Sequence, residues 1–132
     1  MGRRKHDMAN AIKEKKKHVA FASLSNHGVS AKKTKLVVDL VRGMDVTRAL
    51  GVLRFTPNKS ASVIEKLLLS AIANWENKNP DKDIEEAGLY IKEIYVNQKG
   101  MLKRIQPAPQ GRAHRIRKRF SEIKIILGEK NS

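Results

Sequence analysis

The chain has 132 residues and carries 28 Lys and Arg against 13 Asp and Glu, which gives a formal net charge of +15 at pH 7. With 40% apolar residues, this length suits one folded domain with a core and is too short for two. The absence of cysteine excludes disulfides, thiolate metal sites and cysteine nucleophiles. So large an excess of positive charge favours a polyanionic partner, of which nucleic acid is the commonest in a cell.

Targeting signals are not evident in the sequence. No apolar run reaches the roughly 18 residues that a membrane span needs, and the basic stretches lack the apolar face of a membrane-bound helix. The basic start, residues 1–5, has no apolar segment behind it, so we expect no signal peptide. His6, where Ser or Thr would be needed, argues against myristoylation of Gly2. We therefore expect a cytoplasmic protein with no membrane partner.

The first segment, residues 1–17, holds seven Lys or Arg against Asp7 and Glu14 alone. It is either a solvated tail or frayed helix, or a basic arm that orders on a nucleic acid. Residues 18–129 are expected to form a single globular domain that opens with a strand over 18–26, and residues 130–132 a tail.

A helix is predicted over 31–42, with Ser30 as N-cap and Gly43 as its stop. Lys32 and Lys33 lie in its first turn, where the helix dipole disfavours cations by about 0.3–1 kcal/mol each. They are either tolerated surface lysines or residues placed to meet an anion at the helix start. The apolar spacing predicts a buried face made of Leu36, Val37, Leu40 and Val41.

Two more helices are expected before a polar loop at 77–83. Asp45 can cap a short one, and Thr56 and Pro57 read as N-cap and first residue of a longer one. The longer helix carries an apolar stripe at intervals of three and four residues, which predicts core packing. The stripe consists of Ala61, Ile64, Leu68, Ala71 and Trp75.

The stretch 99–119 contains eight Lys or Arg and no Asp or Glu, around a turn signal of two prolines and a glycine. The flanking segments 89–96 and 120–127 are rich in β-branched and aromatic residues, which favour strands. This pattern predicts a β-hairpin, at about 91–120, whose end is suited to binding phosphates.

Side-chain alternation predicts that Ile123, Ile125 and Leu127 share one face of the returning strand. If no bulge intervenes, Arg115, Arg117 and Arg119 continue that same face, which changes from apolar to arginine. Arms of about 12–15 residues would reach ~40–50 Å at ~3.3 Å per residue, so the outer half should project beyond the core. Because an isolated two-stranded ribbon is marginally stable in water, its partner must supply the missing stabilisation.

Catalysis is poorly supported. The four histidines lack metal-ligand spacing, and His114 among arginines has no nearby carboxylate to orient it as a nuclease acid or base, so a phosphate or base contact fits it better. We expect no enzyme, catalytic residue, metal or cofactor. Most of the six aromatic residues fall on predicted core faces, so recognition should rest on phosphates and RNA shape rather than on base stacking.

Three blocks together resemble the bacterial-type large-subunit ribosomal protein L-twenty-two family. They are Lys103–Pro107 followed by Gly111–Arg119, the helix block Ser30–Gly43, and Leu67–Asn74. Their order and spacing match over roughly residues 18–127.

The resemblance implies an α+β fold: three helices packed on a small three-stranded antiparallel sheet, with a long protruding β-hairpin. It implies a structural constituent of the large ribosomal subunit that binds and bridges rRNA during assembly, while its hairpin tip lines the nascent-peptide exit tunnel. The implied partners are large-subunit rRNA, neighbouring ribosomal proteins and the nascent peptide passing the tip, with no homo-oligomer. The implied rRNA-binding residues are Lys32, Lys33, Lys35, Arg42, Lys99, Lys103, Arg104, Arg112, His114, Arg115, Arg117, Lys118 and Arg119. The implied tip residues are Pro107, Ala108, Pro109, Gln110, Gly111 and Arg112.

The chain departs from the family pattern at the tip, where Ala108 and Pro109 stand in place of the usual Arg-Ala. The turn thereby loses a cation and gains a ring that fixes φ and removes a donor. The alternative interpretation of the whole chain is a stand-alone basic DNA-binding or nucleoid protein, which would be expected to dimerise.

Overall fold

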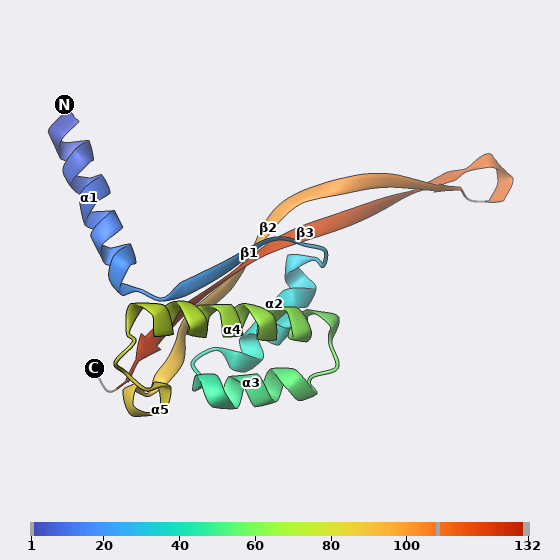
Figure 1. The fold of residues 1–132 in the computed structure, drawn as a ribbon. Coiled ribbons are helices and arrows are strands. Elements are labelled where there is room, and N and C mark those ends of the chain that lie inside the picture. The colour runs from blue at the N-terminus through green and yellow to red at the C-terminus, as the bar shows by residue number, and fades with distance from the viewer. Residues whose placement is uncertain (1, 108, 131–132) are drawn as a thin grey trace.

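A computed structural model describes residues 2–107 and 109–130, with residues 17 and 18 as backbone only. A layer of three helices, α2 (Ala31–Val41), α3 (Val46–Phe55) and α4 (Lys59–Lys78), packs on a three-stranded antiparallel sheet (Figure 1). The strands β1 (Phe21–His27), β2 (Leu89–Pro107) and β3 (Ala113–Glu129) lie in the order β1-β3-β2. The expected α+β class and long hairpin are confirmed.

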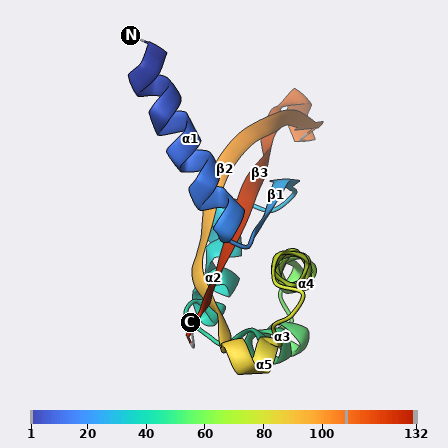
Figure 2. The same cartoon turned by 60° about the vertical axis from the view of Figure 1, so that its left-hand side comes forward.

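Two helices lie outside this layer. The basic segment forms helix α1 (Gly2–His18), which extends away from the rest of the molecule (Figures 1 and 2). Lys78, the last residue of α4, contacts the C-terminal end of α1: its ammonium donates to the carbonyls of Lys16 and Val19, at 2.9 and 2.6 Å. The polar loop after α4 leads into a one-turn helix, α5 (Ile84–Ala87), which the sequence did not predict.

Helix α2 begins and ends as its sequence predicts. The Ser30 hydroxyl accepts from the Lys33 amide at 3.4 Å, and Gly43 follows the helix with φ +79°, a conformation that glycine adopts without strain.

The predicted buried face of α2 was half wrong, because Leu36 is 65% exposed and Leu40 48% exposed. The buried stripe is instead Thr34, Val37, Val38 and Val41. The run of apolar residues allows either stripe, and the polar Thr34 belongs inside because its hydroxyl donates to the Ser30 carbonyl at 3.0 Å.

The start of α4 was also placed wrongly. Asn58 is its N-cap and Lys59 its first residue. Thr56 instead ends α3, where its hydroxyl donates to the Val52 carbonyl at 2.6 Å. A threonine before a proline serves either role in sequence, and here the local hydrogen bond to the preceding turn prevails.

The core lies between α4 and the inner face of the sheet. The predicted α4 stripe is confirmed, since Ala61, Ile64, Leu68, Ala71 and Trp75 are all at most 3% exposed. On β3, alternate residues from Ser121 to Leu127 are buried. Full burial of a large aliphatic side chain stabilises the fold by about 1.5–3 kcal/mol, so this contact anchors the base of the hairpin.

The hairpin strands are longer than expected, at 19 residues for β2 and 17 for β3. The register shifts twice, between Ile91 and Glu93 and between Gln98 and Met101, and each time β2 advances one residue more than β3. Both bulges therefore lie in β2, and the alternation along β3 is unbroken. The arginines at 115, 117 and 119 thus continue the face of the buried isoleucines, as predicted, and the outer hairpin projects past the helices (Figure 1).

Candidate nucleic-acid interface

The outer hairpin forms a cationic shaft, defined here as residues 97–107 and 113–119. Every described side chain in it is exposed except Ile116, which is half-buried. The sequence contains no Asp or Glu from residue 94 to residue 121. Among the described residues, the shaft makes an ion pair at its base, where the Lys99 ammonium lies 3.7 Å from a Glu122 carboxylate oxygen. Almost all of the shaft's positive charge therefore faces solvent without a counter-charge from the protein.

The pairing of β2 with β3 brings cations together across the shaft. Lys103 lies directly opposite Arg117, and like charges in that position destabilise a sheet. On the same face, Met101 lies opposite Arg119 and Ile105 opposite Arg115. Ile105 is 73% exposed, so this face carries exposed apolar side chains beside the arginine guanidinium groups. Such a surface is strained by its own charge until an anion neutralises it.

The predicted tip residues end the shaft, apart from Ala108, which lies outside the described residues. The 3-10 turn Pro109–Gly111 reverses the chain, with φ of +65° at Gln110 and +72° at Gly111. The left-handed conformation at Gln110 is uncommon for a residue with a side chain, so the turn holds its shape against a local preference.

The predicted cations of α2 fall into two groups. Lys32, Lys33 and Lys35 are exposed near its N-terminal end. Arg42, at the other end, is engaged within the protein: its guanidinium donates to Asp39 at 2.7 Å and to the Ile94 carbonyl at 3.0 Å. Arg42 therefore ties α2 to β2, whatever contact it makes with a partner.

A cleft of about 800 Å³, here called the base cleft, lies where the shaft leaves the helical layer. Five of its nine lining residues are cationic and none is acidic. They come from α2 (Lys33), α4 (Lys59) and β3 (Arg117, Lys118 and Arg119), with Phe120 and residues 28–30 completing the wall. Lys59 was not predicted as a site residue, although it occupies the first turn of a helix, as Lys32 and Lys33 do.

A buried polar cluster stands at the same junction. His27 is 7% exposed, and its Nε2 lies 3.1 Å from the Ser60 hydroxyl, which is 3.4 Å from the Thr34 hydroxyl. Burial, and then the charge of Lys59, lower the pKa of His27 below its usual value of 6.5. Burial is the larger cause, and the smaller effect of Lys59 acts in the same direction because both disfavour the charged imidazolium.

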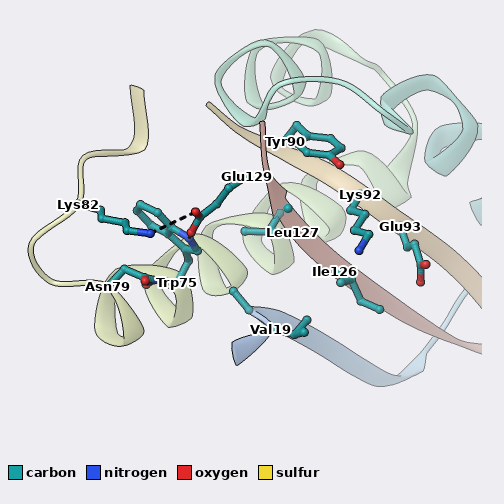
Figure 3. Close-up of a pocket in the computed structure, with 12 residues that line it drawn as sticks. Val19, Trp75, Asn79, Lys82, Tyr90, Lys92, Glu93, Ile126, Leu127 and Glu129 are labelled. Carbon is teal, nitrogen blue, oxygen red and sulfur yellow. Dashed lines mark hydrogen bonds and ion pairs between the residues drawn. The ribbon is translucent and has the colours of Figure 1, made fainter. Parts of the chain in front are cut away.

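A second depression, of about 620 Å³, lies at the opposite end of the sheet, beside Trp75 (Figure 3). Two of its four charged residues, Lys82 and Glu129, form an ion pair with each other. Glu129 accepts from the Trp75 indole at 2.8 Å and from the Lys82 ammonium at 3.3 Å (Figure 3). These contacts fasten the end of β3 to α4 and the loop after it, so we interpret this depression as structural.

The aromatic residues are less buried than predicted. Of the six, only Trp75 is buried, whereas Phe55 is 86% and Tyr95 37% exposed. Phe120 lines the base cleft. The expectation that most aromatics belong to the core was therefore wrong.

Within the described residues, no three His, Asp or Glu side chains gather as ligands for a metal ion. No helix in that part of the chain has the length and apolar character of a membrane crossing.

The fold and the charge distribution define a small basic domain with a long cationic hairpin that extends outside the core. Residues 22–128 match the family model described as Ribosomal protein L22p/L17e. The chain is 55% identical to the large ribosomal subunit protein uL22 of Flavobacterium johnsoniae and 54% identical to that of Flavobacterium psychrophilum, over all of this chain and 96% of each relative. It is 48% identical to the uL22 of Porphyromonas gingivalis over all of this chain and 98% of that protein. The chain belongs to the ribosomal protein L22p/L17e family, as its sequence blocks indicated.

Proposed function

We propose that this protein, a structural and non-enzymatic constituent of the large ribosomal subunit, binds and bridges large-subunit rRNA through its shaft and the start of α2. As a ribosomal protein of the cytoplasm it assembles with rRNA and other ribosomal proteins; the residues that make the contacts are the proposal. Family membership does not favour the alternative of a stand-alone DNA-binding or nucleoid protein.

The acid-free shaft is the observation that carries the proposal. Between residues 94 and 121 eight Lys or Arg face no carboxylate of their own segment, and they stand on a ribbon beyond the core. Arginine forks can bridge two phosphate oxygens at once. Two RNA helices that approach the same ribbon would be screened from each other by these charges, which lowers the cost of packing them closely.

We propose further that the tip, residues 107–112, contacts the nascent peptide in the exit tunnel. The turn is the part of the hairpin farthest from the helical layer (Figure 1). It carries one cation, Arg112, beside Gln110 and the two prolines. Such a surface offers a passing peptide few strong contacts, which suits a wall that a chain must slide along.

Crosslinking in intact large subunits tests both parts. A photo-reactive residue at Arg115 should crosslink to rRNA, and one at Gln110 should crosslink to the nascent chain of a stalled ribosome. The same probe at Arg48, an exposed residue of α3 outside the hairpin, is the control with which both crosslinks are compared. If the Arg115 probe captured no rRNA, the shaft would not be the RNA-binding surface.

A further inference from the structure

We propose that the base cleft seats a single phosphate of the RNA and thereby fixes the angle of the hairpin to the helical layer. This inference rests on the proposed function, since it assigns one site within the RNA-binding surface. It goes further by giving that site a mechanical role and by including Lys59.

The cleft lies between the helical layer and the shaft. Lys33 and Lys59 belong to the helical layer, whereas Arg117 and Arg119 belong to the shaft. An anion between them would accept from both parts at once. Charge-assisted hydrogen bonds of this kind are roughly twice as strong as neutral ones.

The cleft lies at the level of the second bulge in β2. Arg119 pairs with Met101, the first residue after the β2 bulge that follows Gln98. A bulge leaves one residue unpaired and lets the strand bend. The hydrogen-bonded pairing of β2 with β3 is therefore interrupted next to the cleft, where it constrains the direction of the hairpin less.

Without an anion, the charges around the cleft work against a fixed hairpin. Five cations line it with no acid among its lining residues, and like charges repel across it. One of these cations, Lys59, also acts on the buried His27, where it adds to the larger effect of burial in lowering the pKa of the imidazole. Free protein should therefore sample a range of hairpin angles.

The shape and chemistry of the cleft favour a backbone phosphate. The 20-residue helix α4 begins there, and its N-cap Asn58 makes no side-chain cap hydrogen bond, so its first amides add to the positive potential. Donors arrive from three elements, and a phosphate has enough oxygens to accept from all of them. Val29 and Phe120 add an apolar wall against which a ribose can pack.

Distances between spin labels on the full chain test this inference. Because the chain has no cysteine, labels can be attached at Ser70→Cys on α4 and Gln106→Cys on β2, both exposed positions. Adding large-subunit rRNA should narrow the distance distribution. The variant Lys33→Gln/Lys59→Gln should bind rRNA with a log–log salt slope shallower by about 0.7–0.9, one phosphate contact, and should keep a broad distribution.

The matched control is Arg48→Gln/Lys66→Gln, which removes two exposed cations away from the cleft and should behave like the parent protein. The inference would be overturned if rRNA narrowed the distance distribution of Lys33→Gln/Lys59→Gln as much as that of the control. It would also be overturned if the parent protein bound rRNA and its distance distribution did not narrow. Failure of the parent protein to bind rRNA at all would instead refute the proposed function.

A second variant supplies the anion from the protein itself. Lys59→Glu places a carboxylate among Lys33, Arg117 and Arg119, so it should narrow the distribution before RNA is added. A distribution as broad as that of the free parent protein would contradict the view that an anion in the cleft holds the hairpin.

Discussion

Replacing Arg115, Arg117 and Arg119 together by glutamine tests whether this face of the shaft meets phosphates. The three residues follow one another at every second position of β3, about 6.6 Å apart at ~3.3 Å per residue. Arg117 and Arg119 line the base cleft and would share one phosphate, whereas Arg115 lies opposite Ile105, farther out. The variant therefore loses two phosphate contacts.

Each lost contact removes about 0.7–0.9 from the slope of log affinity against log salt, so the slope should become shallower by about 1.4–1.8. The assay is a filter-binding or anisotropy titration of large-subunit rRNA at several salt concentrations. The fold should survive, because all three side chains are exposed. Removing Arg117 also relieves its like-charge pair with Lys103, which is worth about 0.2–1 kcal/mol.

The control is Arg48→Gln/Lys66→Gln/Lys92→Gln, which has the same net charge as the shaft variant but changes residues elsewhere on the surface. Its slope should equal that of the parent protein. The reasoning fails if the shaft variant keeps the parent slope, or if the control loses as much as the shaft variant does.

Three predictions concern the domain itself. The pKa of His27 is lowered in the folded state, so below about pH 6.5 the unfolded chain binds more protons and the free energy of unfolding should fall as the pH falls. In urea melts at several pH values, the free energy of unfolding of His27→Gln should fall less steeply than that of the parent protein, by at most about 1.4 kcal/mol per pH unit. The Ser121 hydroxyl is buried, and within the described residues it has no hydrogen-bond partner, so Ser121→Ala should leave the free energy of unfolding unchanged or raise it. A clear decrease in the free energy of unfolding would mean that the hydroxyl makes a stabilising hydrogen bond. Leu68→Ala, in the centre of the core, should lower the free energy of unfolding by about 2–5 kcal/mol in the same melts. A loss below about 1 kcal/mol would mean that this face of α4 is not buried in the core.

Local signals in the sequence predicted the parts of the fold that depend on near neighbours. The Ser30 cap and Gly43 gave the ends of α2, and the stripe through Leu68 gave the buried face of α4. The alternation along β3 predicted the arginine face of the shaft, because both bulges fall in the other strand.

Contacts between distant segments decided what the sequence left open. Leu36 and Val38 are equally apolar, and only the position of the sheet and α4 determines that Val38 is buried. Thr56 is a different case, because a local contact decided whether it begins one helix or ends another: its hydroxyl donates to the Val52 carbonyl four residues earlier. The base cleft joins Lys33, Lys59 and Arg117, which lie far apart in the sequence, so no local pattern could assemble it.

The most direct test of the account is amide exchange on the full chain, free and bound to large-subunit rRNA. The outer hairpin, residues 103–116, should exchange rapidly in the free protein while β3 from Ile123 to Leu127 stays protected, since only the latter lies on the core. Binding should protect the outer hairpin. Strong protection of residues 103–116 without RNA, or none with it, would contradict a ribbon that depends on RNA for its final shape.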